Sequence, residues 1–291
     1  MMMNNYDIKQ YVEKYKLPNK NVKYEWVKCH DTFLFLQLFS PSQSKEENET
    51  VLLLHGFFDH TGTNASLIKH LLGQGFHVAA FDLPGHGLSG GERYQVNSFQ
   101  EYQFALHSIL ETLNVWEIQK VHGIGHSTGG AILADYLLAG TPALFKKVGL
   151  VSPLIRPSQW WVSKLSAPLL SVFLKELPRK FRMNAGNSSF MKKIKEDPLQ
   201  GKVVSLKWVK AMFEWEKQLK TNDPIDRNIL IIQGTKDQTV DWKHNMDAYH
   251  QLFPKAKRIL VDNGSHHLLN ERKAQKEIVY QLLIKYLKSQ G

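Results

Sequence analysis

An alternation of short apolar runs with longer amphipathic segments is the feature that most restricts the fold of this chain. Val51–Gly56 (VLLLHG) is a run of the first kind, and Asn64–Gly75 (NASLIKHLLGQG) has helical spacing with an Asn at its start and a Gly at its end. Strands buried on both faces read as continuous apolar runs, so the alternation predicts an α/β fold with a mostly parallel central sheet and helices on both faces. Further strands are expected at 77–83, 121–126, 148–153, 228–234 and 257–264, and further helices at 98–114, 128–140 and 271–287.

Two segments depart from this alternation. Near the N-terminus, Tyr24–Cys29 and Thr32–Phe39 are strand-like runs separated by a short break, as in a hairpin. Later, Leu154–Asn222 is rich in Trp, Lys and helical spacing and has no obvious strand. We therefore predict a core made of residues 1–153 and 223–291. Residues 154–222 are expected to form a helical cap over the C-terminal edge of the sheet, where α/β proteins bind ligands.

Composition places the chain among ordinary globular proteins. It has 291 residues, of which 43% are hydrophobic and 22% charged, which suffices for a sizeable core. Cys29 is the single cysteine, which excludes an intrachain disulfide and a metal site built from cysteines, and fits a reducing compartment. The N-terminal stretch has no apolar signal-peptide core, and no run approaches the ~18 apolar residues of a membrane-spanning helix. The expected location is the cytoplasm.

The pattern Gly-x-Ser-x-Gly occurs twice, at Gly87–Gly91 (GLSGG) and at Gly125–Gly129 (GHSTG). This pattern can place a nucleophilic serine on a sharp turn between a strand and a helix, where glycines allow close packing. Ser127 follows a predicted strand directly and precedes a predicted helix without a gap. Ser89 is separated from its strand by PGHG, and a polar, non-periodic stretch follows it. We therefore predict Ser127 as the nucleophile and Ser89 as a loop residue.

A serine nucleophile needs a base and a carboxylate that orients this base, and in this architecture they follow in the order Ser, Asp or Glu, His. Asp237 comes directly after one predicted strand, and His266 and His267 come after the next. The oxyanion of an acyl-transfer intermediate needs backbone N–H donors. Thr128, which follows the nucleophile, and Phe57, in the loop after the first central strand, are the expected donors.

Several motifs in this order resemble the α/β-hydrolase superfamily, and more narrowly the monoacylglycerol lipase/lysophospholipase group that is classified with serine aminopeptidases. HGFFDH is similar to the H-G-x-G-E-H loop of this group, and FDLPGHGLSGG to its D-x-x-G-H-G-x-S segment. GHSTGG matches G-H-S-x-G-G, GTKD matches the loop that carries the acid, and SHHLLNE resembles H-E-L-L-N-E. The resemblance runs from about Val51 to Glu271 and implies the α/β-hydrolase fold.

The chain departs from the motifs of this group at several positions. Phe58 stands where the group has a glycine, and Asp59 where it has a glutamate. The doubled histidine leaves two choices for the base. In the motif of the group the catalytic histidine lies five residues before the final glutamate, and counting back from Glu271 gives His266. His267 then takes the place of the glutamate that usually follows.

The resemblance implies a serine hydrolase that acts on monoacylglycerols, lysophospholipids or similar single-chain esters through an acyl-enzyme on Ser127. His266 would be the base, Asp237 would orient it, and no metal or organic cofactor is implied. An aminopeptidase or a thioesterase using the same residues is the alternative, as is a binding protein without catalytic activity. The expected ligand is a small acyl ester. Nucleic acid is not expected, and the oligomeric state stays open.

The net charge of +10 is concentrated in one part of the chain. Between Leu154 and Asn222 there are 14 Lys and Arg against 5 Asp and Glu, whereas the rest of the chain holds 23 against 22. Trp160 and Trp161 stand beside this charge. Basic and aromatic residues together are typical of contact with an anionic lipid surface, but a solvated basic face has the same composition. For the lipid contact we expect Lys175, Arg179, Lys180 and Arg182 to be the basic residues involved.

Overall fold

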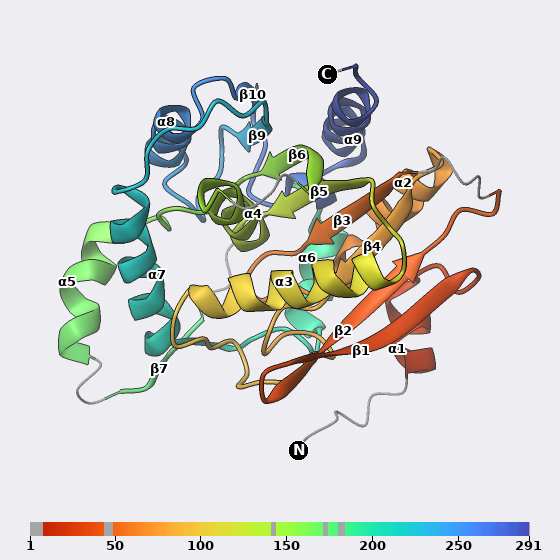
Figure 1. The fold of residues 1–291 in the computed structure, drawn as a ribbon. Coiled ribbons are helices and arrows are strands. Elements are labelled where there is room, and N and C mark those ends of the chain that lie inside the picture. The colour runs from red at the N-terminus through yellow and green to blue at the C-terminus, as the bar shows by residue number, and fades with distance from the viewer. Residues whose placement is uncertain (1–7, 44–48, 141–143, 171–173, 180–183, 291) are drawn as a thin grey trace.

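The chain forms a mixed sheet of eight strands, with helices on both faces, in a computed structural model (Figure 1). The structure describes residues 8–43, 49–140, 144–170, 174–179 and 184–290. In space the strands follow the order β1-β2-β4-β3-β5-β6-β9-β10. Their bounds are Val22–Cys29 (β1), Thr32–Phe39 (β2), Thr50–Leu54 (β3), His77–Phe81 (β4), Val121–His126 (β5), Phe145–Val151 (β6), Leu230–Gly234 (β9) and Lys257–Val261 (β10).

The strand pairing confirms the mostly parallel sheet. From β4 to β10 every neighbouring pair is parallel, while β2 runs antiparallel to both β1 and β4. β1 and β2 form the expected hairpin, with Cys29 opposite Thr32. The parallel strands are short, and every residue of β3, β5 and β9 is buried. Burial on both faces explains why these strands read as continuous apolar runs in the sequence.

Helices bury the two faces of the sheet in two separate hydrophobic clusters. One cluster joins the sheet to α3, α4 and α8, and the other joins it to α1, α2 and α9. Tyr102 and Ile132 are fully buried in the first cluster, and Tyr11 and Ile68 in the second. The bounds are Ile8–Tyr15 (α1), Ala65–Gly73 (α2), Gln100–Val115 (α3), Thr128–Leu138 (α4), Trp242–Leu252 (α8) and Lys273–Leu287 (α9), with short 3-10 helices at Thr61–Asn64 (η1) and Leu268–Asn270 (η2).

The segment Leu154–Asn222 follows β6 and contains helices and one small sheet. Its helices are α5 (Trp160–Leu170), α6 (Ser188–Glu196) and α7 (Leu206–Leu219). The expectation that it has no strand is wrong, because β7 (Glu176–Pro178) pairs antiparallel with β8 (Val203–Ser205). Each of these strands has three residues, too few to show an alternating pattern in the sequence.

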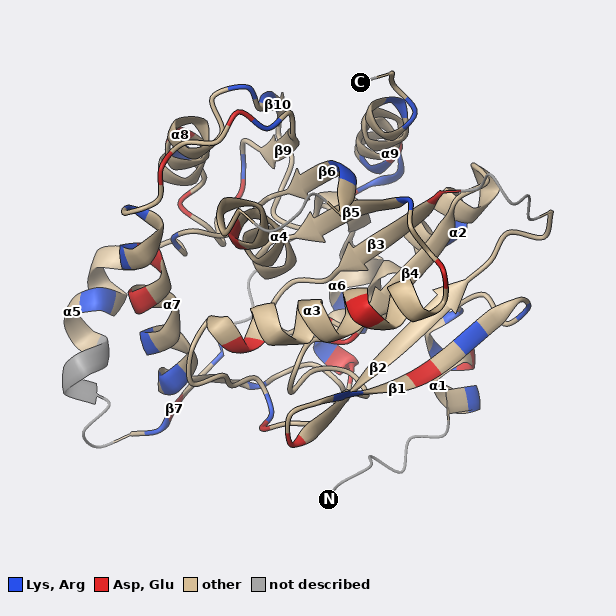
Figure 2. Ribbon diagram, in the orientation of Figure 1, with Lys and Arg blue, Asp and Glu red and all other residues tan. Residues whose placement is uncertain are grey.

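Most of the basic excess lies in this same segment, and Figure 2 shows Lys and Arg on α5 and α7. The two adjacent tryptophans of α5 have different environments. Trp160 is only 2% exposed and packs against Phe213 of α7, whereas Trp161 is 64% exposed. No helix among the described residues has both the length and the apolar character needed to traverse a lipid bilayer.

Candidate active site

Ser127 lies at the point where β5 ends and α4 begins. Its backbone has φ 51° and ψ −113°, a region that residues other than glycine rarely adopt. The turn is held on both sides, because the Ser127 amide donates to the carbonyl of Val151 at 3.0 Å and the Ala131 amide donates to the carbonyl of Ser127 at 3.0 Å. A strained serine between a strand and a helix is the geometry of a nucleophile elbow.

The glycines of the Ser127 motif are required by close backbone packing. A Cβ at Gly125 would collide with the carbonyl of Gly129, and a Cβ at Gly129 would collide with the carbonyls of Leu54 and His55. α4 therefore packs directly against the ends of β3 and β5. This contact requires glycine at both positions.

His266 and Asp237, predicted from separate strands, are hydrogen-bonded to each other. His266 Nδ1 lies 2.8 Å from Asp237 Oδ2, and both side chains are buried. Asp237 comes from the loop after β9 and His266 from the loop after β10, which are neighbouring parallel strands. A carboxylate can only accept a hydrogen bond, so Nδ1 carries the proton and Nε2 remains as the basic nitrogen of the neutral ring.

Asp237 is fixed by further hydrogen bonds. Gln233 Nε2 donates to Oδ2 at 3.0 Å, and the amides of Thr239 and Val240 donate to Oδ1 at 2.8 and 3.1 Å. Burial alone would raise the pKa of Asp237, but the attraction of His266 and these hydrogen bonds outweigh it and lower the pKa. The carboxylate is therefore ionised and held in one orientation. Gln233 was not predicted from the sequence.

A pocket of about 380 Å³ brings most of the predicted residues together. Ser127, Thr128, Phe57 and His266 all line it, and Asp237 lies behind His266. The segment Leu154–Asn222 contributes part of the wall. Its lining residues include Leu154, Leu177, Arg179, Val204, Leu206, Trp208, Val209 and Met212.

The two expected oxyanion donors, Phe57 and Thr128, line the same pocket as Ser127. Thr128 is the first residue of α4, so its amide has no acceptor within the helix. The loop after β3 approaches Ser127 closely, since a Cβ at Gly56 would be 3.2 Å from the Cβ of Ser127. Phe57 follows Gly56 in this loop, and its ring stacks on Trp208 at 3.9 Å between centroids.

A protein-family model, Hydrolase_4, described as serine aminopeptidase S33, matches residues 45–273. The chain belongs to the S33 family. A solved structure, that of the monoacylglycerol lipase of Paleococcus ferrophilus, superposes with a TM-score of 0.74 at 25% identity, over 87% of this chain and 98% of that one. This confirms the α/β-hydrolase fold and the monoacylglycerol lipase/lysophospholipase type, within a family of lipase and esterase enzymes.

Two relatives differ in the share of their own length that this chain covers. Human monoglyceride lipase is 27% identical over 263 residues, which are 84% of this chain and 83% of that protein. An uncharacterized abhydrolase domain-containing protein of Dictyostelium discoideum is 26% identical over 247 residues, which are 80% of this chain. The chain spans only about a quarter of that protein, 26% of its length.

The departures from the S33 motifs have structural explanations. Phe58 has φ 72°, a left-handed conformation that favours glycine, and this explains the glycine of the related motif. Here the phenyl ring is covered by the guanidinium of Arg179, whose Cζ lies 4.0 Å from the ring centroid. The side chain thus packs against Arg179 of the segment 154–222 although its backbone is strained.

The second histidine of the doubled pair has a different environment from the first. His267 Nδ1 lies 3.8 Å from Asp59 Oδ2, and the side chain is buried. Burial lowers the pKa of His267 to about 3, so the ring is neutral near pH 7. The hydrogen bond to Asp237 belongs to His266, in agreement with the count back from Glu271. Glu271 itself accepts a hydrogen bond from the Ser265 amide at 2.8 Å.

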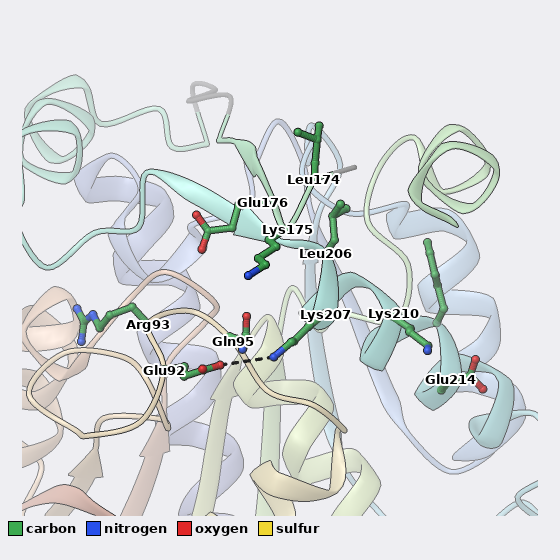
Figure 3. A pocket seen from close by; sticks show the side chains of 11 residues that line it. Glu92, Arg93, Gln95, Leu174, Lys175, Glu176, Leu206, Lys207, Lys210 and Glu214 are labelled. Carbon is green, nitrogen blue, oxygen red and sulfur yellow. Dashed lines mark ion pairs between the residues drawn. The ribbon is translucent and has the colours of Figure 1, made fainter. Parts of the chain in front are cut away.

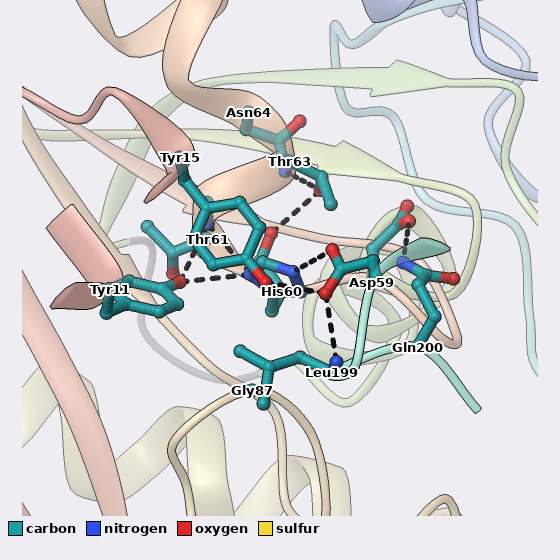
Figure 4. A network of polar contacts seen from close by, with 12 residues as sticks. Tyr11, Tyr15, Asp59, His60, Thr61, Thr63, Asn64, Gly87, Leu199 and Gln200 are labelled. Atoms are coloured by element: carbon teal, nitrogen blue, oxygen red, sulfur yellow. Dashed lines mark hydrogen bonds and ion pairs between the residues drawn. The ribbon is translucent and has the colours of Figure 1, made fainter. Parts of the chain in front are cut away.

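A buried polar network, which was not predicted, surrounds the loop after β3 (Figure 4). His60 is central to it, with Tyr11 Oη 3.0 Å from Nδ1 and Asp197 Oδ2 3.1 Å from Nε2. Tyr15 Oη donates to Asp197 Oδ1 at 2.5 Å, and Gln200 Nε2 donates to Asp59 Oδ1 at 3.4 Å. The network joins α1, the loop after β3 and the segment between α6 and β8.

A second hollow, of about 810 Å³, lies between the loop at Glu92 and the segment that carries α7 (Figure 3). Its walls carry both signs of charge, including Lys175, Lys207 and Lys210 beside Glu176 and Glu214. Lys207 Nζ and Glu92 Oε2 are 3.9 Å apart across it. No predicted site residue lines this hollow, so the pocket at Ser127 is the candidate active site.

Proposed function

We propose that this S33 protein cleaves carboxylic esters of single-chain lipids, either monoacylglycerols or lysophospholipids, through an acyl-enzyme on Ser127. The observation that carries the proposal is the shared pocket, in which strained Ser127 and His266 line one cavity and Asp237 orients the imidazole from behind. This arrangement supplies a nucleophile, a base and a group that selects the tautomer of the base. The roles of these three residues are part of the proposal.

In the proposed mechanism, His266 Nε2 accepts the proton of the Ser127 hydroxyl as Oγ attacks the ester carbonyl. The amides of Phe57 and Thr128 donate to the oxyanion that forms. Collapse of the intermediate expels the alcohol, which takes the proton from His266, and leaves the acyl group on Ser127. Water then attacks the acyl-enzyme with the same base, releasing the fatty acid and the free serine.

The walls of the pocket support an acyl substrate. Leu154, Leu177, Trp208, Val209 and Met212 present apolar surface next to Ser127, which suits a hydrocarbon chain. Since several of these residues come from the segment 154–222, we infer that this segment is a cap on a core of residues 1–153 and 223–291. The similarity to human monoglyceride lipase, which covers most of both chains, also supports a monoacylglycerol substrate.

An aminopeptidase on the same residues is the alternative function. Such an enzyme needs a carboxylate that is free to hold the amine of its substrate. Among the described residues that line the pocket, Asp59 is the sole carboxylate, and its Oδ2 faces His126 and His267 at 3.6 and 3.8 Å. This carboxylate is already engaged by two histidines, which favours an ester substrate. A thioester substrate would use the same mechanism.

We also propose contact between the cap segment and an anionic lipid surface, with the enzyme located in the cytoplasm. Trp161, Val162 and Leu165 form an exposed apolar strip on α5, and Lys164 lies among them. This strip replaces the contact expected from Trp160, which is buried. Of the expected basic residues, Lys175 is exposed but Arg179 donates to Gln200 Oε1 at 2.8 Å and to the Gly201 carbonyl at 3.1 Å. Lys180 and Arg182 lie outside the described residues.

A substrate panel tests the proposed function. Initial rates would be measured on p-nitrophenyl esters from acetate to palmitate, monoacylglycerol, lysophosphatidylcholine, an acyl thioester and aminoacyl p-nitroanilides. We expect hydrolysis of the lipid esters, abolished in Ser127→Ala. A clear preference for the anilides would overturn the lipid-ester proposal and establish the aminopeptidase.

A further inference from the structure

Asp59, His126 and His267 gather at one side of the pocket, and the mechanism above uses none of them. His126 Nδ1 lies 3.6 Å and His267 Nδ1 lies 3.8 Å from Asp59 Oδ2. Each side chain offers a ligand atom, and these atoms all lie within 4.8 Å of one another. All three residues are buried, with exposed fractions of 3% for Asp59, 3% for His126 and 6% for His267. They come from three separate loops or strand ends.

Two further polar atoms of this trio, one on His126 and one on Asp59, have second partners. His126 Nε2 lies 3.1 Å from the carbonyl of His266, and because a carbonyl can only accept, Nε2 carries the hydrogen. In the neutral ring Nδ1 then bears the lone pair, on the side of the Asp59 carboxylate. Asp59 Oδ1 accepts from Gln200 Nε2 at 3.4 Å, and Figure 4 shows the two side chains next to each other. Asp59 Oδ2 is the carboxylate oxygen that faces His126 and His267.

Metal-binding histidines usually donate their second ring N–H to a carbonyl or carboxylate, and metal-binding carboxylates are hydrogen-bonded in turn. His126 and Asp59 show these two features. A divalent ion between Asp59 Oδ2 and His126 Nδ1 could bind to both atoms.

We propose that Asp59, His126 and His267 bind a Zn²⁺ ion in the wall of the pocket. Two histidines and a carboxylate are a common ligand set for zinc, with bonds of about 2.0 to 2.2 Å, and in tetrahedral geometry the ligand atoms are then about 3.4 Å apart. The observed 3.6 and 3.8 Å are within a few tenths of an ångström of this separation. All three residues line the pocket, so the site is in its wall.

The ion is not a cofactor of the proposed reaction and would act against it. The ring of His266 lies 4.9 Å from that of His126 and 5.5 Å from that of His267, measured between centroids. A bound ion and its remaining ligand would lie in the wall of the pocket that Ser127 also lines, where they would obstruct the substrate. Zinc is therefore expected to inhibit ester hydrolysis and a chelator to restore it. This regulation goes beyond the proposed function.

Equilibrium dialysis of chelator-treated protein against ZnCl₂, with metal quantified by mass spectrometry, tests the site without any use of activity. Wild type should bind one Zn²⁺ per chain. Asp59→Asn, which keeps the shape of the side chain, and His267→Ala should each weaken this binding by tenfold or more. His250→Ala, which removes an exposed histidine on α8, should bind like wild type.

The thermal midpoint is a second measurement on the same proteins, because an ion that binds the folded state raises it. Zn²⁺ should raise the midpoint of wild type and of His250→Ala, and should leave that of folded Asp59→Asn unchanged. Less than one ion per chain, or equal zinc affinity in wild type, Asp59→Asn and His267→Ala, would overturn the proposal. Inhibition by zinc that persists at equal strength in His267→Ala would overturn the regulatory role.

Discussion

The hydroxyl of Ser89 accepts a hydrogen bond from the backbone amide of Phe35 at 2.8 Å. The same hydroxyl donates to the carbonyl of Asp82 at 2.5 Å. As acceptor and as donor, it therefore fixes the loop after β4 against β2. The Gly-x-Ser-x-Gly motif at Gly87–Gly91 thus has a structural serine at its centre. Ser127, by contrast, faces the pocket.

Replacing each serine with alanine should separate these roles. Ser127→Ala is expected to lower kcat for p-nitrophenyl butyrate by at least about 10³-fold with the fold intact, because the nucleophile is lost. Ser89→Ala should keep most of this activity and lose about 1 to 3 kcal/mol of stability, because two buried backbone groups lose their partner. Activity in Ser127→Ala together with inactivity in Ser89→Ala would reverse the assignment.

The doubled histidine can be resolved with a matched pair of variants. His266→Ala is expected to reduce hydrolysis about as strongly as Ser127→Ala, since the base bound to Asp237 is removed. His267→Ala should lose no more than about tenfold, because this ring has no contact with Asp237. Labelling of Ser127 by a fluorophosphonate gives an independent measurement, and the rate should fall much further in His266→Ala. The opposite order would transfer the role of base to His267.

A glycine pair tests the turn that carries the nucleophile. Gly129→Ala should lower the free energy of unfolding by about 3 kcal/mol or more, because its Cβ would meet the carbonyls of Leu54 and His55. Gly73→Ala is the control, since it lies in α2 with open space around it and should gain about 0.5 to 1 kcal/mol. Urea denaturation measures both changes. Equal stability of the two variants would contradict the close packing of α4.

Asp197 should give the fold a defined sensitivity to acid. Burial alone would raise its pKa, but hydrogen bonds from His60, Tyr15 and the Leu199 amide outweigh burial and lower the pKa. A lowered folded-state pKa means that the stabilisation is fully present above the unfolded value of about 3.9 and disappears as pH falls through the folded value.

Urea midpoints of wild type and Asp197→Asn at pH 6 and pH 3.5 test this sensitivity. The variant should be less stable at pH 6, by about 1 to 3 kcal/mol, because it loses the charged acceptor of His60 and Tyr15. The difference between the two proteins should narrow at pH 3.5. A difference that stays constant would show that Asp197 does not contribute to the acid sensitivity.

Vesicle binding tests the apolar strip on α5. The double variant Trp161→Glu with Leu165→Glu should lose co-sedimentation with anionic vesicles at low salt, because it adds negative charge to the exposed face. Ile278→Glu changes another exposed apolar residue, on α9, and should bind like wild type. Binding of wild type should fall as salt rises. Equal binding to zwitterionic vesicles would remove the role of charge, and no binding to either would leave α5 as a solvated face.

The sequence predicted those features that depend on contacts between neighbours in the chain. The turn at Ser127 is local, because β5, the serine and α4 follow one another without a gap. The order of the parallel strands then brought Asp237 and His266 together. The different exposure of Trp160 and Trp161 could also have been predicted. Successive residues of a helix point about 100° apart, so the two side chains cannot both face the core.

Contacts between distant segments could not be predicted in this way. Asp59, His126 and His267 meet only because the end of β5 and the loops after β3 and β10 lie at the same edge of the sheet, and each residue alone is unremarkable in its own stretch of sequence. The β7–β8 pair consists of two very short strands on either side of α6, without a periodic signal. The positive φ of Phe58 was hidden because the residue present is not the glycine that marks such a turn.

The network around His60 ties three distant parts of the chain to one another inside the protein. Tyr11 and Tyr15 come from the N-terminal helix, His60 from the loop after β3 and Asp197 from the cap segment. If one of these three segments moved away from the other two, a buried donor or the Asp197 carboxylate would lose its hydrogen-bond partner. The cap should therefore have no independent melting transition. Calorimetry is expected to show a single cooperative unit, with equal calorimetric and van't Hoff enthalpies, although we propose that the fold consists of a core and an inserted cap.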